Sequence, residues 1–108
     1  MIVIVFRSRI RADADMAALG AMGERMYELA SAMPGFLSYK DFTAEDGESV
    51  TVVEFATEAE LLAWRHQPEH VAGQERGRLE FFSEYQIQVC HVERAYGFTI
   101  ADGWRAIG

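Results

Sequence analysis

The spacing of the hydrophobic residues changes along the chain in an order that few folds can accommodate. Alternating apolar residues, typical of a strand, give way to apolar residues every three or four positions, typical of a helix. The predicted elements, in order, are strand 2–10, helix 13–33, strands 36–43 and 49–56, helices 58–65 and 69–83, and strand 85–94. The order β-α-β-β-α-β predicts a ferredoxin-like α+β domain, with a four-stranded antiparallel sheet and helices on one of its faces.

Short local motifs set the ends of these elements. Pro34-Gly35 ends the first helix, and the Asp46-Gly47 dipeptide indicates a hairpin between the two middle strands. Thr57 and Glu60 have the spacing of a capping box, so we expect a helix to begin just after Thr57. Pro68 then breaks this helix or opens the first turn of a new one.

The first strand is apolar on both of its faces, which predicts a partner. Val3 and Val5 point away from the face that carries Ile2, while one layer of helices covers only one side of the sheet. We therefore expect a homodimer whose sheets pack face to face, a dimeric α+β barrel. Arg7 and Arg9 would share this interface and, if buried there, need carboxylate partners, for which the candidates are Glu54, Asp41 and Glu93.

Composition narrows the classes of partner and the location of the protein. Acidic residues number 17 against 10 Lys and Arg, so neither nucleic acid nor an anionic membrane is an expected partner. The apolar start, residues 1–6, is shorter than the roughly 7–15 residues of a signal sequence, which favours a cytoplasmic protein. Cys90, the single cysteine, is expected to be a buried thiol. Residues 1–96 form the predicted domain, and residues 97–108 a tail without clear period.

The chemically richest stretch runs from Trp64 to His70. His66 and His70 have the i, i+4 spacing of metal ligands, but Pro68 separates them and no third ligand is evident, so we expect no metal site. His70 falls in the first turn of the helix after Pro68, where the helix dipole favours a neutral imidazole. Such a ring could accept a proton from a phenol or quinol, or it could simply cap or fill the corner between the helices.

Trp64 also has two interpretations. It either anchors its helix to the sheet or forms a stacking wall for a small aromatic molecule. The predicted walls of a pocket between sheet and helices are Phe6, Ser8, Met26, Phe36 and Phe55. No glycine-rich phosphate loop or dinucleotide fingerprint is present in the sequence, so we expect no flavin or nicotinamide cofactor.

Three segments resemble the antibiotic biosynthesis monooxygenase (ABM) superfamily of dimeric α+β barrels. They are Pro34-Gly35-Phe36-Leu37, residues 50–55 and residues 57–70, and the resemblance extends over about residues 2–94. Members of this superfamily include cofactor-independent oxygenases of quinols and polyketide-like phenols, haem-degrading enzymes, and proteins without an assigned reaction. The fold therefore implies a pocket more strongly than a particular chemistry.

The haem-degrading members use an Asn on the first strand, a Trp on the second helix, and a His nine or ten residues later. Trp64 matches, but the other positions correspond to Phe6 and to Gly73 or Gln74. Without that histidine the haem iron would lose its axial ligand, which disfavours haem degradation.

The phenol-oxidising members use an Asn and a Trp on the third strand, where this chain has Thr51 and Phe55. The leading expectation is nevertheless a cofactor-independent monooxygenase acting on a small aromatic, quinol or polyketide-like phenol. In this interpretation His70 is the base and Trp64 the wall. The alternative is a non-catalytic dimer of the same fold that binds ligands or acts as a scaffold.

Overall fold

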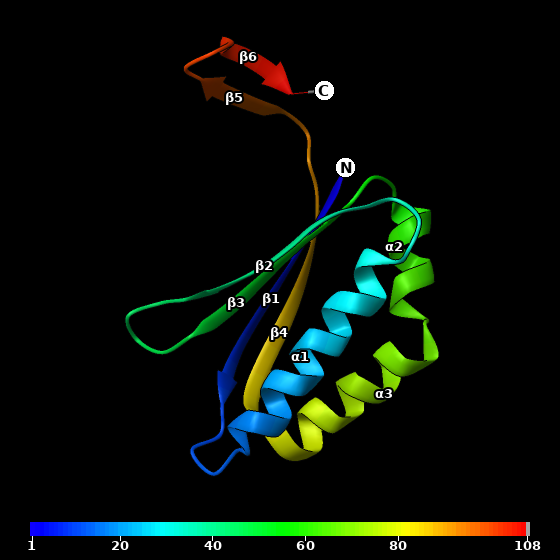
Figure 1. The fold of residues 1–108 in the computed structure, drawn as a ribbon, viewed down its shortest axis with the longest axis vertical. Coiled ribbons are helices and arrows are strands. Elements are labelled where there is room, and N and C mark those ends of the chain that lie inside the picture. The colour runs from blue at the N-terminus through cyan, green and yellow to red at the C-terminus, as the bar shows by residue number, and fades with distance from the viewer. Residues whose placement is uncertain (108) are drawn as a thin grey trace.

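Four antiparallel strands build the sheet, in the spatial order β2-β3-β1-β4 (Figure 1). They are β1 (Ile2–Ile10), β2 (Phe36–Thr43), β3 (Ser49–Phe55) and β4 (Phe82–His91). The computed structural model describes residues 1–107. Two of the strands have the predicted bounds, and the ferredoxin-like α+β fold is confirmed.

Three helices lie on one side of this sheet (Figure 1). They are α1 (Met16–Ser31), α2 (Glu58–Arg65) and α3 (Pro68–Arg76), and a π-helical turn, η1 (Gly77–Phe81), follows α3 directly. Within residues 1–107, none of the helices is long and apolar enough to cross a membrane.

Side-chain caps explain where the second and third helices begin. The Thr57 hydroxyl accepts a hydrogen bond from the Glu60 amide at 3.3 Å, which confirms Thr57 as the N-cap, and it donates to the Glu60 carboxylate at 2.9 Å. Gln67 caps α3 by accepting from the His70 amide at 2.8 Å. Pro68 is the first residue of α3, where its missing amide hydrogen is not needed.

The strand register divides the sheet residues between two faces. Ile2 and Ile4 of β1 lie opposite Phe55 and Val53 of β3 and face the helices. The buried hydrophobic core consists of Ile2, Ile4, Ala30, Val53, Phe55, Leu61 and Trp64. Val3 and Val5 belong to the other face, which has no helix over it and is called here the open face.

The predicted partners of the two arginines on the open face are wrong. Arg7 makes two hydrogen bonds of 3.1 Å to Glu48, and Arg9 pairs with Asp46 at 3.0 Å and with Glu84 at 3.4 Å. The acidic turn between β2 and β3 lies beside the end of β1, so its side chains reach the arginines first. Cys90 is exposed rather than buried, because β4 is an edge strand and Cys90 lies on its open face opposite Val3.

The last helical segment ends earlier than predicted, at Phe81, and β4 begins at Phe82 instead of Tyr85. Arg11 holds this junction together. Its guanidinium donates to the backbone carbonyls of Arg78 at 2.6 Å, Leu79 at 2.9 Å and Phe82 at 3.0 Å. Arg11, the residue that follows β1, therefore supplies a donor to carbonyl groups that have no helical partner at the end of η1.

Replacing Arg11 with glutamine is expected to lower the free energy of unfolding by about 1–2 kcal/mol, because several carbonyl groups lose a charged donor. Urea unfolding followed by circular dichroism measures the effect. Arg94→Gln is the matched control, since Arg94 is exposed, and its effect should stay within about 0.5 kcal/mol. Equal stability of the two variants would show that Arg11 does not hold the junction.

The C-terminal residues form a hairpin of β5 (Ala95–Thr99) and β6 (Gly103–Ile107), although their sequence has no clear period. The predicted domain boundary between residues 96 and 97 therefore falls inside a strand. The hairpin extends away from the helices (Figure 1). Tyr96 and Trp104 stack on each other with ring centroids 5.5 Å apart, and Trp104 remains 67% exposed.

Candidate active site

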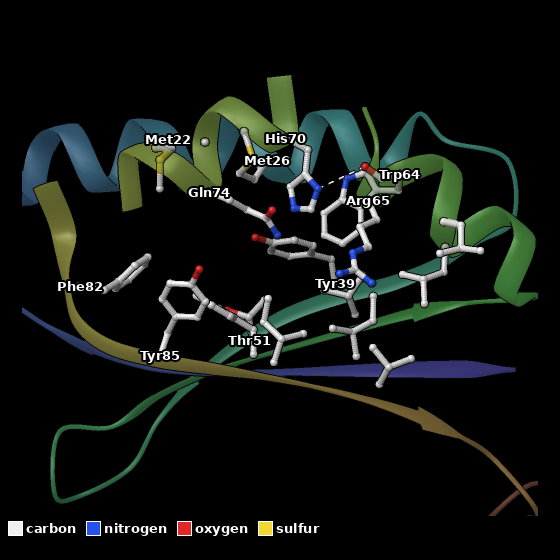
Figure 2. Close-up of a pocket in the computed structure, with 18 of the residues that line it drawn as sticks. Met22, Met26, Tyr39, Thr51, Trp64, Arg65, His70, Gln74, Phe82 and Tyr85 are labelled. Atoms are coloured by element: carbon white, nitrogen blue, oxygen red, sulfur yellow. Dashed lines mark hydrogen bonds between the residues drawn. The ribbon is translucent and has the colours of Figure 1, made fainter. Parts of the chain in front are cut away.

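A cavity of about 590 Å³ lies between the sheet and the helices (Figure 2). Its volume is within the range typical of small-molecule sites. The lining residues from the sheet include Ile4, Phe6, Thr51, Val53, Ile87 and Val89, and those from the helices include Met22, Met26, Leu61, Trp64, His70, Gly73 and Gln74. Most of these side chains are apolar, and the few polar ones converge on the space between the layers (Figure 2).

His70 is the third residue of α3 and is only 8% exposed. Its ring stacks on the Trp64 indole with the centroids 3.9 Å apart and the planes inclined by 17°. The Nδ1 atom lies 3.2 Å from the Trp64 carbonyl oxygen. Because a carbonyl only accepts hydrogen bonds, this contact assigns the proton to Nδ1 and leaves Nε2 with a free lone pair. Figure 2 shows the ring directed from α3 toward the sheet.

Burial keeps the His70 imidazole neutral. Removal of the ring from water lowers the pKa of His70 below its ordinary value of 6.5, and hydrogen bonding to the backbone of Trp64 and Arg65 opposes this only in part. A neutral ring was also expected from the sequence, but the expected cause was the helix dipole and not burial. At neutral pH, Nε2 is therefore the ring atom that can accept a proton.

Trp64 anchors α2 to the sheet, and its role as a stacking wall for an aromatic molecule stays a prediction. Its indole packs on Phe55, with centroids 5.6 Å apart, and it belongs to the core, yet it also lines the cavity. The indole Nε1 is buried and has no hydrogen-bond partner among residues 1–107. Two rings thus pack against the indole, Phe55 from the sheet and His70 from α3.

The other predicted wall residues divide into two groups. Phe6 and Met26 line the cavity, whereas Ser8, Phe36 and Phe55 do not. Phe55 is completely buried in the core, and Phe36 packs against it at 6.1 Å. Ser8 lies farther along β1 and contributes to a separate small cavity. All three lie on the predicted strands. Other side chains separate Phe36 and Phe55 from the main cavity, and Ser8 lies beyond that cavity along β1.

Several polar residues of the cavity were not predicted. Gln74 and Arg78 follow His70 at intervals of four along α3 and η1, which places them on one side of the helical segment. The Arg78 guanidinium donates to the Tyr85 hydroxyl at 3.0 Å. Tyr39 also lines the cavity, and burial together with the charge of Asp41 raises the pKa of its phenol to about 12. The four-residue spacing is visible in the sequence, but the alternating charges of Glu75, Arg76, Arg78 and Glu80 are also typical of a solvated helix surface.

Gly73 and Gly77 allow close packing of side chains from α1 and β4 against α3 and η1. A Cβ atom at Gly73 would lie 3.0 Å from the Met26 methyl group, and one at Gly77 would lie 2.9 Å from the Phe82 ring. Gly73 is also one of the two positions where the haem-degrading members have their ligand histidine. Glycine has no side chain that could ligate haem iron.

The histidine pair at positions 66 and 70 does not form a shared site. His66 is exposed at the C-terminus of α2, whereas His70 is buried in α3. Within the part of the chain that the structure describes, no three His, Cys, Asp or Glu side chains come together as potential metal ligands.

Comparisons with known proteins agree with this architecture. A family model described as "Antibiotic biosynthesis monooxygenase" matches residues 1–76. Uncharacterized protein YqjZ of Bacillus subtilis (strain 168) is 33% identical over 90 residues, which cover 83% of this chain and 78% of that protein. 

Two solved structures share the fold at lower sequence identity. Rv0793 from Mycobacterium tuberculosis has a TM-score of 0.74 and 22% identity, over 84% of this chain and 93% of that one. SnoaB, a cofactor-independent oxygenase from Streptomyces nogalater, has a TM-score of 0.72 and 12% identity, over 87% of this chain and 94% of that one.

Proposed function

This chain belongs to the antibiotic biosynthesis monooxygenase family, and we propose that it oxygenates a small phenolic or quinol-like aromatic substrate without a cofactor. One observation carries the proposal: a buried neutral histidine, His70, keeps Nε2 available at a largely apolar cavity. The cavity walls include Trp64, Phe6 and Met26, whose flat or adaptable surfaces suit an aromatic ring. The likeness to SnoaB, a cofactor-independent oxygenase, supports the class of reaction.

The proposed chemistry begins with proton transfer. Nε2 of His70 accepts the phenolic proton, and the electron pair of the phenolate is delocalised onto a ring carbon. For an anthrone-type substrate, that carbon attacks O₂, and the resulting peroxide loses water to leave a ketone. The balance is CH₂ + O₂ → C=O + H₂O: one oxygen atom enters the product, the other leaves as water, and the substrate supplies all four electrons. The proton on His70 returns with the departing water.

Oxygen uptake tests the proposal. Protein freed of metal ions by a chelator and shown to lack flavin absorbance is mixed with a panel of anthrones and hydroquinones in an oxygen electrode. We expect at least one anthrone to consume one O₂ for each ketone formed, at a rate well above that of buffer. Saturable binding of these compounds without oxygen uptake would instead support the non-catalytic ligand-binding dimer.

We also propose that the protein is a homodimer. The open face carries apolar side chains from three strands, namely Val3, Val5, Phe42, Val50 and Val52. The C-terminal hairpin adds the aromatic rings of Tyr96, Phe98 and Trp104. A two-stranded hairpin is only marginally stable alone in water, so these rings favour burial against a second copy.

Substituting both Phe98 and Trp104 with serine is expected to weaken this dimer at least tenfold, because the paired rings are 70% and 67% exposed in the protomer. Sedimentation velocity at low micromolar concentration measures the shift toward monomer. Arg105→Ser alters the opposite face of the same hairpin and should leave the dimer intact. A wild-type protein that sediments as a stable monomer under these conditions would contradict the proposed dimer.

A further inference from the structure

The cavity has a positively charged group at the end away from Trp64. Arg78, in the η1 turn, lines the cavity and donates a hydrogen bond of 3.0 Å to the hydroxyl of Tyr85 on β4. No carboxylate of residues 1–107 forms an ion pair with this guanidinium. The hydrogen bond to Tyr85 is the main cause that raises the pKa of Arg78, and the charge of Glu75 adds a smaller part. Arg78 thus has one neutral partner and further N–H groups available for another acceptor.

Apart from Arg65, which also lines the cavity without an ion pair among residues 1–107, the arginines near the cavity and on the sheet are engaged differently. Arg7, Arg9, Arg25 and Arg76 each contact at least one carboxylate, and Arg11 donates to three backbone carbonyls. In a chain with 17 acidic and 10 basic side chains, carboxylate partners are abundant. An arginine that lines a cavity without such a partner is therefore suited to bind an anionic ligand.

The local structure holds Arg78 in place. Arg11 donates to the Arg78 carbonyl oxygen at 2.6 Å, which fixes the backbone of the η1 turn, and Tyr85 holds the guanidinium from the sheet. π-helical turns of this kind occur frequently at functional sites. The Arg78 side chain is exposed to solvent, and the Tyr85 contact already restricts its guanidinium, which lowers the conformational entropy lost when an anion binds.

We propose that the substrate carries a carboxylate, which Arg78 binds while the phenolic end of the same molecule lies at Nε2 of His70. The position of the phenolic end rests on the function proposed above. Eight residues separate His70 from Arg78, which corresponds to about 12 Å along a helix. The substrate is then an extended aromatic acid of more than one ring, and Gln74 lies between its two ends.

Equilibrium binding of two matched probes tests this proposal. Anthraquinone-2-carboxylate and its neutral carboxamide have nearly the same shape and differ in charge. Binding is followed by fluorescence in a Trp104→Phe background, so that Trp64 is the sole tryptophan reporter. We expect the protein to bind the carboxylate at least tenfold more tightly than the carboxamide. Arg78→Gln should weaken carboxylate binding about 10- to 100-fold and leave carboxamide binding within twofold.

Control variants separate a specific contact from general charge. Arg76→Gln removes a neighbouring arginine that pairs with Glu80 at 2.6 Å and does not line the cavity, so both affinities should stay unchanged. Tyr85→Phe frees the Arg78 guanidinium and should weaken carboxylate binding several-fold. Arg65 also lines the cavity without a carboxylate partner among residues 1–107, near Trp64, so Arg65→Gln tests the opposite end (Figure 2).

Three results would overturn the proposal. The wild-type protein could bind the two probes with equal affinity, or Arg78→Gln could weaken the binding of both probes equally. The third is that Arg65→Gln abolishes the carboxylate preference while Arg78→Gln does not. The binding experiment involves no turnover. If the protein prefers the carboxylate through Arg78 yet consumes no oxygen, the proposed acid site stands and the proposed reaction is contradicted. If the protein consumes oxygen without a carboxylate preference, the proposed reaction stands and the proposed acid site is contradicted.

Discussion

The His70→Gln variant is expected to lose a factor of about 10²–10⁴ in kcat/KM for an oxygenated phenolic substrate, because His70 is the one histidine among residues 1–107 that lines the cavity. Glutamine can still donate to the Trp64 carbonyl oxygen, which Nδ1 approaches at 3.2 Å, so the shape of the corner is largely preserved. What it lacks is a basic nitrogen directed at the cavity. Initial rates of oxygen uptake, measured at equal concentrations of folded protein, give the ratio.

His66→Gln is the matched control for this experiment. His66 lies four residues earlier in the chain but is exposed at the end of α2 and does not line the cavity, so its replacement should leave the rate unchanged. If His70→Gln retains more than a third of the wild-type rate, His70 is not the base.

The pH dependence of the same protein follows from the lowered pKa of His70. Since the neutral ring is the active form, kcat/KM should decline on the acid side, at pH values below 6.5. Stability should decline in the same region. The unfolded chain takes up the histidine proton near pH 6.5, whereas the folded protein does so only at lower pH, so the free energy of unfolding falls between these two values. This contribution should be absent from His70→Gln.

Phe55→Ala is expected to lower the free energy of unfolding by about 3–5 kcal/mol, the range for a large aromatic ring removed from a packed core. Phe55 is 0% exposed and contacts the rings of both Phe36 and Trp64. Its loss would also remove the support on which the Trp64 indole and, through it, His70 are stacked. Urea unfolding at one fixed protein concentration measures the change, since a dimer's stability depends on concentration.

Leu79→Ala is the control for Phe55→Ala, because the Leu79 side chain is 75% exposed and should contribute less than about 0.5 kcal/mol. A loss below 1 kcal/mol in Phe55→Ala would mean that the contact between β3 and α2 through Phe55 and Trp64 is not a principal source of stability.

Much of the fold could be predicted from the sequence because the local preferences agree with the tertiary arrangement. The helix at 58–65 was predicted with its observed bounds, since Thr57 and Glu60 define its start and Pro68 prevents its continuation. The first strand was equally clear, with Ile2 and Ile4 on the buried face and Val3 on the other. In each case the signal lies within a few neighbouring residues.

Features that depend on contacts between distant segments could not be predicted. Phe55 was assigned to the pocket because its strand face is correct, but the Trp64 indole covers it. The partner of Arg7 depends on where the turn holding Glu48 folds. Arg78 belongs to a run of alternating charges typical of a solvated helix surface, and the sequence does not reveal the π-helical turn or the contact with Tyr85, seven residues away.

The state of the His70 ring is the most direct test of the central claim. Nitrogen-15 NMR of protein labelled at histidine, at pH 7.5, distinguishes a protonated from an unprotonated ring nitrogen, and His66→Gln and His91→Gln variants assign the three residues. We predict that His70 carries its proton on Nδ1, that Nε2 is unprotonated, and that only the His70 signals shift when a phenol is added. A proton on Nε2, or a phenol that leaves the His70 signals unchanged, would contradict the role of His70 as the base.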